Sequence, residues 1–554
     1  MNFIENESEQ KLRGGYYTPD DLAEFLVRWI ATRQPETILE PGCGDGVFLE
    51  KLGLHLNDTT VFGFEVDSEE AQKARCRAQS VNLTNIKVHE NDFLGWAAEA
   101  IENDVIRFDA VVGNPPFIRY QYLPSVFQSR AERIFKDLNC KFTKHTNAWV
   151  PFVLASFALL RPGGRLAMVV PAEIIHVLHA RSLREYIGEH ARKIVLIDPE
   201  ELWFSNTLQG AVLLLAEKRR DKYESAQGVG IYPVRGREFV KKDPEVLFGV
   251  PRPINGKTVE GKWTRALLEP RTRSLIDGVT VLKSVRRFDE IARVDVGIVT
   301  GANKFFLVSD ETVQRFGLGK WSHPMFGRSQ HCPGIIYDQM QHISNAKRGY
   351  PTNFIWFKDR MVEDSPAAKA YILHGERSNL NKRYKCRVRK PWYSVPSVYS
   401  TQIGMLKRAH HIPRLILNEL NAYTTDTAYR ISVKEGTARQ LVFNFVNPLT
   451  ALSAELEGRH YGGGVLELVP SEIEQLLIPL PVNVRTDLRL LDKLIRFESV
   501  DDVLERQGQT ILSPLGLSSS EQSELLFGWK RLRDRRNRVA SKTAQDQREQ
   551  KNLL

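Results

Sequence analysis

Residues 38–49 read Ile38-Leu39-Glu40-Pro41-Gly42-Cys43-Gly44-Asp45-Gly46-Val47-Phe48-Leu49. The apolar start predicts a buried strand, and the end has the apolar spacing of a helix. Three alternate glycines separate the two elements, and glycine allows the backbone to approach a ligand closely. A strand, a glycine-rich turn and a helix in this order predict the first unit of a doubly wound α/β sheet with a ligand at the turn.

Two further units follow at the spacing that this fold requires. Apolar residues 60–64 lead to Glu65, about 20 residues beyond the loop, where a carboxylate grips a ribose diol in dinucleotide-type folds. Residues 86–94 then offer Asp92 to an adenine amine and Phe93 to cover its ring. The spacing fits a cofactor that carries adenosine. Alternating strand and helix patterns continue to about Ala216, so a Rossmann-like, mostly parallel sheet is expected.

The motif Asn114-Pro115-Pro116-Phe117 stands directly after the apolar run 108–113. The Asn114 amide oxygen and the Pro115 carbonyl are two neighbouring acceptors for one planar NH2 group, and Phe117 offers a face for stacking. Such a pocket suits the amino group of a nucleobase. Asn-Pro dipeptides also mark ordinary turns, and it is the upstream units that favour the functional interpretation.

In this order, the motifs of the N-terminal part of the chain, up to the apolar run 212–216, resemble those of the gamma class of S-adenosylmethionine-dependent DNA adenine-N6 methyltransferases. The family often has Tyr where Phe117 stands, which leaves the stacking face intact. The resemblance implies these contacts: Thr18, within Gly15-Tyr16-Tyr17-Thr18-Pro19, for the methionine part of the cofactor; Glu40, Gly42, Gly44 and Gly46 for the cofactor loop; Glu65 for the ribose; Asp92 and Phe93 for the adenine; Asn114, Pro115, Pro116 and Phe117 for the target amine.

Residues 201–211 are similar to the family segment whose aromatic side chain packs against an extruded base. Phe204 fits this role best and Trp203 is the second candidate, while core packing beside the next strand is the alternative interpretation. The chemistry implied by the resemblance needs positioning rather than a metal or a covalent intermediate. The target adenine would be flipped out of the duplex, because its amino group lies inside the base stack.

Charge is distributed unevenly along the 554 residues. Residues 1–200 contain 22 Lys and Arg against 28 Asp and Glu, and the remaining residues contain 55 against 39. A basic surface neutralises phosphates, so double-stranded DNA is the expected partner. The five cysteines show no metal-ligand spacing, and no metal site is expected. The start of the chain lacks a signal pattern and the longest apolar run is too short to span a bilayer, so a cytoplasmic protein without membrane contact is expected.

The length predicts two or three domains. We expect a catalytic domain over residues 1–245 and a connector over 246–284. A mixed α+β target-recognition domain would follow over 285–484, with a helical segment over 485–554. Residues 296–306 and 461–468 resemble the opening and closing portions of the family's recognition domain.

Four cations in this half, Arg383, Lys385, Arg387 and Arg389, alternate with other residues. An extended strand would place all four on one face, and phosphate contact is our hypothesis for them, with a solvated charged face as the alternative. A second basic stretch, residues 529–536, is compatible with a DNA clamp or with a solvated helix.

The sequence therefore predicts a site-specific DNA adenine-N6 methyltransferase of a restriction-modification system. Such a protein would act as a monomer, and any cognate endonuclease would be a separate polypeptide. A methyltransferase for cytosine N4, RNA or a protein glutamine amide is the enzymatic alternative, and a DNA-binding protein with an inactive methyltransferase fold is the other. The basic second half favours duplex DNA.

Overall fold

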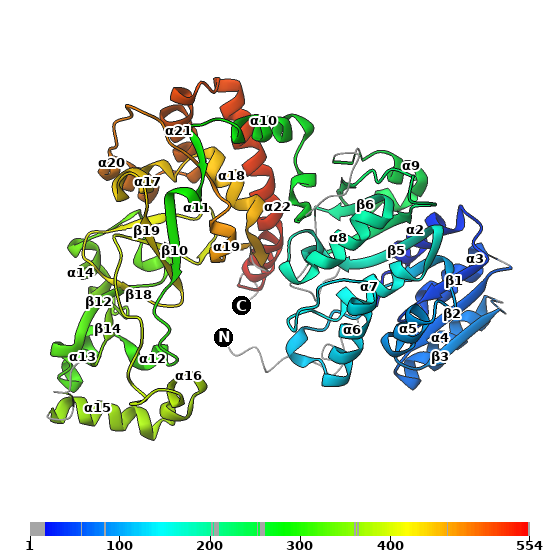
Figure 1. The fold of residues 1–554 in the computed structure, drawn as a ribbon, viewed down its shortest axis with the longest axis horizontal. Coiled ribbons are helices and arrows are strands. Elements are labelled where there is room, and N and C mark those ends of the chain that lie inside the picture. Colours follow the sequence, from blue (N-terminus) through cyan, green and yellow to red (C-terminus); the bar gives the residue numbers. More distant parts are fainter. Residues whose placement is uncertain are drawn as a thin grey trace. The chain divides into compact units, whose positions relative to one another are not determined.

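The computed structural model describes residues 17–56, 58–81, 83, 85–200, 203, 210–251, 253–254, 261–358, 362, 365–461 and 464–551, with side chains up to residue 537. The chain forms two compact units (Figure 1). The first contains the chain up to Leu267, and the second is Leu268–Asn537. The division falls inside the predicted connector 246–284.

The first unit is built on an eight-stranded sheet with the order β3-β2-β1-β4-β5-β7-β6-β8. Neighbouring strands are parallel except for β7, which is antiparallel to both β5 and β6. This confirms the predicted Rossmann-like, mostly parallel sheet. The strands are β1 Thr37–Glu40, β2 Thr60–Glu65, β3 Ile86–Glu90, β4 Phe108–Gly113, β5 Leu160–Pro171, β6 Ala191–Pro199, β7 Ala211–Lys218 and β8 Val229–Val234. The helices are α2 Asp20–Ala31, α3 Val47–His55, α4 Ser68–Ser80, α5 Phe93–Glu102, α6 Ser125–Asp137, α7 Trp149–Ala158, α8 Arg181–His190 and α9 Pro244–Gly249.

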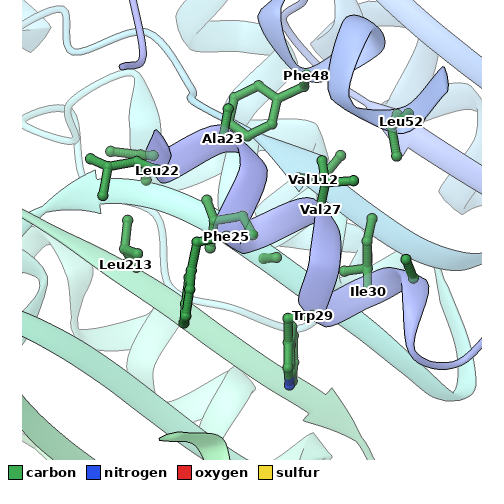
Figure 2. Packing of buried hydrophobic residues seen from close by; sticks show 14 of the residues in the cluster. Leu22, Ala23, Phe25, Val27, Trp29, Ile30, Phe48, Leu52, Val112 and Leu213 are labelled. Carbon is green, nitrogen blue, oxygen red and sulfur yellow. The ribbon is translucent and has the colours of Figure 1, made fainter. Parts of the chain in front are cut away.

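Helix α2 fills the core on one face of this sheet. Its apolar residues recur at helical spacing, and Leu22, Phe25 and Trp29 are 0% exposed. They share one core cluster with Val112 of β4 and Leu213 of β7, and Figure 2 shows Val112 beside Val27 of the helix. Burial of each large side chain stabilises the fold by about 1.5–3 kcal/mol. The packing fixes the start of α2, directly after Thr18, against the sheet.

The carboxyl ends of β2, β1 and β4 lie next to one another because these strands are parallel neighbours. Glu65, Glu40 and Gly113 are the last residues of the three strands. Ligands of open α/β sheets bind at this edge. The topology therefore brings together three motifs that are up to 73 residues apart in the sequence, counted from Glu40 to Gly113.

Residues just beyond 245 belong to the first unit and do not form a loose connector. Leu247 and Phe248 are 1% and 4% exposed, and the Phe248 ring lies 4.8 Å from that of Trp29. The Lys193 ammonium donates to the Gly249 carbonyl at 3.0 Å. Val246 and Val250 are exposed, so Leu247 and Phe248 are the apolar residues that attach this segment to the first core.

The second unit is a mixed α+β structure, as expected. It contains a five-stranded sheet of order β10-β19-β15-β17-β13 and a four-stranded sheet of order β11-β14-β12-β18, besides smaller sheets. These strands are β10 Ala292–Val296, β11 Leu307–Val308, β12 Ser322–Phe326, β13 Ile336–Tyr337, β14 Asn353–Ile355, β15 Ile403–Leu406, β17 Leu415–Asn418, β18 Tyr423–Thr424 and β19 Ala428–Val433. The longer helices are α10 Pro270–Thr280, α14 Gln339–Lys347, α15 Pro366–Arg377, α18 Pro448–Glu457, α20 Leu488–Phe497, α21 Val500–Leu512 and α22 Ser519–Lys551.

The basic stretch 529–536 lies on α22 and packs against the second unit. Trp529 and Leu532 are buried, and the guanidinium of Arg536, which is fully buried, pairs with the Glu455 carboxylate at 2.6 Å. Other cations of the stretch pair with carboxylates: Lys530 and Arg533 with Asp501, and Arg531 with Glu269. The packing contradicts a fully solvated helix, and DNA contact by this stretch stays a prediction. In the described part of the chain, no helix has the length and apolarity needed to cross a membrane.

Candidate active site

The glycine loop after β1 borders open space at two of its three glycines. A Cβ atom added at Gly42 or Gly44 would meet nothing within 4 Å. At Gly46 a Cβ would lie 2.5 Å from the Cα of Ala74 on α4. Gly46 also has φ +86° at the start of α3, a conformation that glycine adopts without strain. Gly42 and Gly44 therefore border open space, whereas Gly46, predicted as a cofactor contact, lets α3 and α4 approach each other.

Glu65 joins the end of β2 to this loop. Its Oε2 accepts a hydrogen bond from the Gly44 N–H at 2.9 Å, and its Oε1 accepts from the N–H groups of Val66 and Asp67 at 2.9 and 3.0 Å. Oε2 accepts only one of these three bonds, so it has further acceptor capacity, which a ribose hydroxyl could use. The structure thus brings Glu65 and Gly44 together beside the open space.

Glu40 is a buried carboxylate at the same edge. It is 0% exposed, and among the described residues no N–H or O–H group donates a hydrogen bond to either of its oxygens. Burial raises the pKa of Glu40 well above the usual value; the Cys43 thiol lowers it, and the charges of Asp45 and Glu65 raise it. Burying such a group without a partner is costly. A cationic ligand at the glycine loop would remove that cost, so the donor set fits a positively charged cofactor.

Asp92 stands at the start of α5, at the neighbouring strand end. Its Oδ2 accepts from the Gly95 N–H at 2.7 Å and from the Arg130 guanidinium at 2.8 Å. These bonds cap the helix and fix the carboxylate. Phe93 does not fit the role predicted for it, because its ring is 2% exposed and packs against Phe152 at 5.2 Å within the core.

Asn114 meets Thr18 at the crevice. The Asn114 side-chain nitrogen donates to the Thr18 hydroxyl at 3.1 Å, and Thr18 is 6% exposed. The residue predicted to touch the methionine part of the cofactor and the residue predicted to hold the target amine are therefore in direct contact. Pro115 is buried, and Phe117 is half-buried and packs against the core of the unit.

The motif loop also touches the glycine loop. A Cβ added at Gly113 would lie 3.3 Å from Pro41 Cδ and 3.8 Å from Glu40 Cγ. Asn114 is the next residue, so it begins within a few ångströms of the loop after β1. Side chains of the loop after β1 and of the Asn114–Phe117 loop can therefore contact the same ligand.

The aromatic side chain predicted to stack on the target base, Phe204, lies outside the described residues. The second candidate, Trp203, is 7% exposed. Its ring stacks on that of Phe239 at 5.5 Å, and the Arg237 guanidinium lies 5.5 Å above it. For Trp203 the core-packing alternative holds.

The predicted basic strand around Arg387 is wrong, because Tyr384–Arg387 form a short helix, α16. In a strand, Tyr384 and Cys386 would lie on the same face, because they are two residues apart. Instead Tyr384 is 65% exposed and Cys386 is buried. The Arg389 guanidinium donates to the carbonyls of Thr300 and Val299, both at 2.7 Å, and so braces the neighbouring turn. The side chains that remain exposed are those of Arg383, Lys385 and Arg387.

Sequence reasoning missed three residues whose side chains form a hydrogen-bond network with the segment that follows the Asn114–Phe117 motif: Asn147, Trp149 and Glu173. They belong to no short motif, and hydrogen bonds across the fold are what connect them. Each lies within or next to a buried apolar run, so the sequence pattern there indicates a core element and does not indicate a functional residue.

Comparison with known proteins agrees with this arrangement. Residues 2–243 match the family model "N-6 DNA Methylase", and residues 260–512 match the model of the C-terminal domain of type II methyltransferase M.Eco57I. The first match covers the strand ends and loops that carry Glu40, Glu65 and Asn114. Residues 2–243 therefore form an N6-adenine DNA methylase domain, and the relatives that match most of the chain are type II DNA methyltransferases.

Relatives of this methyltransferase include type II methyltransferase M.AccI of Acinetobacter calcoaceticus, which is 23% identical over 504 residues, covering 88% of this chain and 87% of that protein. Type II methyltransferase M.XamI of Xanthomonas campestris pv. amaranthicola is 22% identical over 484 residues, covering 85% and 86%. Among solved structures, the type IIG restriction endonuclease BpuSI aligns with 95% of this methyltransferase and 66% of its own chain, at 13% identity and a TM-score of 0.41.

Proposed function

We propose that this methyltransferase binds S-adenosylmethionine at the glycine loop and methylates the N6 amine of an adenine flipped out of duplex DNA. The observation that carries the proposal is the contact between Asn114 and Thr18 beside the crevice at the ends of β1, β2 and β4. In this contact Asn114, proposed to bind the target amine, lies next to Thr18, proposed to bind the methionine part of the cofactor.

Four side chains would hold the cofactor. Glu40 supplies a buried negative charge for its cationic part, Glu65 accepts from the ribose hydroxyls, Asp92 accepts from the adenine amine, and Thr18 lies by the methionine part. When bound, S-adenosylmethionine supplies an electrophilic methyl group on a sulfonium. Open space at Gly42 and Gly44 supports this assignment, because any larger residue would occupy the crevice.

Asn114 and Pro115 would act on the target base. The Asn114 side-chain oxygen and the Pro115 carbonyl accept the two hydrogens of the exocyclic amine, which favours a more tetrahedral and more nucleophilic nitrogen. The Phe117 ring would stack on the base, and Phe204 remains a proposal for its other face. These residues position a reactive nitrogen and need not remove a proton before attack.

Exposed cations on the second unit would hold the DNA backbone. Arg383, Lys385 and Arg387 are exposed, and no ion pair with a carboxylate is found for them among the described residues. Phosphate contacts of this kind supply sequence-independent affinity. The relatives are type II methyltransferases, and we propose that this protein likewise modifies DNA in a restriction-modification system, in the cytoplasm, as a monomer and beside a separately encoded endonuclease.

Substitution of Asn114 by Ala tests the proposal. We expect methyl transfer to DNA to fall below detection while S-adenosylmethionine binding persists, because the variant lacks the acceptor for the amine but keeps Glu40, Glu65 and Asp92. Transfer of a labelled methyl group to unmethylated DNA and calorimetric cofactor binding are the measurements. The matched control is Asn103→Ala, an exposed position at the end of α5, which should leave both unchanged.

Product analysis identifies the substrate in the same assay. N6-methyladenine in the digested DNA supports the proposal, whereas N4-methylcytosine, or label found only in RNA or protein, would contradict it. Full activity of the Asn114→Ala protein would refute the role assigned to Asn114.

A further inference from the structure

Asn147 and Ala148, which directly precede α7, form hydrogen bonds with the segment that follows the Asn114–Phe117 motif. The Ala148 N–H donates to the Ile118 carbonyl at 3.0 Å. The Tyr120 N–H donates to the Asn147 side-chain oxygen at 3.2 Å. These two bonds fix the path of the chain within a few residues of the motif.

Glu173 decides which way the Asn147 amide faces. Its Oε1 accepts from the Asn147 side-chain nitrogen at 3.0 Å and from the Trp149 indole N–H at 3.0 Å. With the Asn147 nitrogen bonded to this carboxylate, the amide is oriented so that its oxygen faces the Tyr120 N–H. The Glu173 side chain is 13% exposed, and Trp149 at 1% exposure cannot move away from it.

Glu173 in turn lies on a braced segment. It belongs to the short helix η2, Ala172–Ile175, directly after β5, and β5 is the neighbour of β4 that carries the motif. The Arg184 guanidinium, 1% exposed, donates to the carbonyls of Ile174 at 2.9 Å, Val177 at 2.8 Å and Gly261 at 2.6 Å. The carboxylate therefore stands at a fixed point relative to the sheet.

We infer that Glu173 is a positioning residue for methyl transfer, which acts through Asn147 on the loop that carries Asn114. The inference rests on the proposed role of that loop. Glu173 works as a hydrogen-bond acceptor, because both donors reach the same oxygen, Oε1. A neutral amide oxygen at this point would serve both donors, whereas a methyl group would release the Asn147 amide and leave a buried indole N–H without its acceptor.

Glu173→Ala and Glu173→Gln test this role. Misplacement of catalytic groups by about 1 Å can lower a rate by a factor of about 100, so we expect Glu173→Ala to lower kcat about 10- to 100-fold. S-adenosylmethionine affinity should be unchanged, since the cofactor residues are on other loops. Glu173→Gln should restore kcat to near the unsubstituted value. Single-turnover methylation of unmethylated plasmid DNA and calorimetric cofactor binding provide the two readouts.

Glu185→Ala is the matched control, because Glu185 lies on the surface of α8 in an exposed pair with Arg181. Its kcat should not change. An active Glu173→Ala protein overturns the inference, and so does a Glu173→Gln protein as slow as Glu173→Ala, which would indicate that the charge is required. Should Glu173→Ala fail to fold, Asn147→Ala decides, because it removes the acceptor for Tyr120 while the Trp149 indole keeps its bond to Glu173. A lower kcat with intact cofactor binding supports the inference, and an unchanged kcat overturns it. Activity in Asn114→Ala would instead refute the proposed function on which the inference depends.

Discussion

At the scale of single residues, Glu40 has the surroundings that differ most from those of a carboxylate in water. It is fully buried, and burial raises its pKa well above the ordinary value of 4.5. Burial in the cofactor-free protein thus shifts the equilibrium toward the neutral form, relative to a carboxyl group in water. Two consequences follow, one for stability and one for cofactor affinity.

The stability consequence depends on the sign of the pKa shift. A carboxyl group whose folded-state pKa is raised contributes stability that is fully present below the unfolded pKa and is lost as the pH rises through the folded pKa. We expect the free energy of unfolding of Glu40→Gln, relative to the unsubstituted protein, to increase with pH by up to about 1.4 kcal/mol per pH unit. Urea unfolding of both cofactor-free proteins across a pH series measures this. A difference that does not vary with pH would contradict the burial argument.

Cofactor affinity should have the opposite dependence on pH. A cationic ligand favours the ionised carboxylate, so the affinity of the unsubstituted protein for S-adenosylmethionine should rise with pH, by at most about tenfold per unit. The Glu40→Gln protein should bind more weakly and show a flatter profile. Calorimetric titration across the same pH series is the measurement, and equal slopes for the two proteins would argue against a contact between Glu40 and the cofactor.

Local motifs predicted several of the site residues because their chemistry depends on near neighbours in the sequence. Glu65 and Asn114 each follow an apolar strand, so their place at the edge of the sheet follows from the strand pattern. Phe93 also follows a strand, but its ring turns into the core toward Phe152, which comes from a helix 59 positions later in the sequence. No local pattern records that contact.

At the scale of elements, the glycine loop and α3 separate two roles that look identical in sequence. A Cβ at Gly42 enters open space, whereas one at Gly46 collides with Ala74 of α4. The three glycines alternate and form one motif. The packing of α3 on α4 and the left-handed backbone of Gly46 distinguish Gly46 from Gly42.

This difference predicts opposite outcomes for two alanine substitutions. Gly46→Ala should destabilise the first unit by about 1–3 kcal/mol, through overpacking and a left-handed backbone. Gly42→Ala should leave the melting temperature unchanged and weaken S-adenosylmethionine binding, because the methyl group enters the crevice. Thermal melting and cofactor titration of the two proteins separate the effects. An unstable Gly42→Ala protein would show that this glycine packs rather than faces the crevice.

The segment around α16 shows why a period of two can mislead. Four cations alternate with other residues, yet the buried side chain is Cys386 and the segment is a helical turn. Arg389 is used inside the structure, on the carbonyls of Val299 and Thr300. Arg387 is exposed, so two neighbouring arginines have different roles.

Single substitutions should reveal this division. Arg387→Ala should weaken binding to all DNA sequences alike and lower the salt slope by about 1, with unfolding unchanged. Arg389→Ala should lower the free energy of unfolding by about 1–3 kcal/mol, since the carbonyl of the buried residue Thr300 loses its donor. Fluorescence anisotropy with DNA and denaturant unfolding measure the two effects. A loss of stability in Arg387→Ala would reject the assignment of this side chain to the exposed face.

At the scale of the whole molecule, the basic excess belongs to the second unit. Residues 268–537 contain 39 Lys and Arg against 29 Asp and Glu, which equals the formal net charge of +10 of the entire chain. Many of these cations are paired, as those on α22 show, so the net charge rather than the number of cations determines attraction to DNA.

The two ligands should therefore respond differently to salt. Affinity for DNA should fall linearly on a double-logarithmic plot, with a slope of about 0.9 per phosphate neutralised. Affinity for S-adenosylmethionine should change little, because Glu40 is buried and weakly screened. Titrations from low to moderate salt compare them in the same preparation. Salt-insensitive DNA binding would contradict the assignment of the basic unit to the DNA backbone.

Sequence alone determined the identity of the chemistry, because strands, glycine turns and the Asn114–Phe117 motif are short-range patterns whose order fixes which ends of the sheet meet. Tertiary structure decided what depends on partners far along the chain: that residues beyond 245 complete the first core, that Arg389 and α22 use their charges internally, and that Glu173 orients Asn147. Such contacts join residues whose separation in sequence carries no pattern, and burial or pairing of a side chain exists only once both partners are in place.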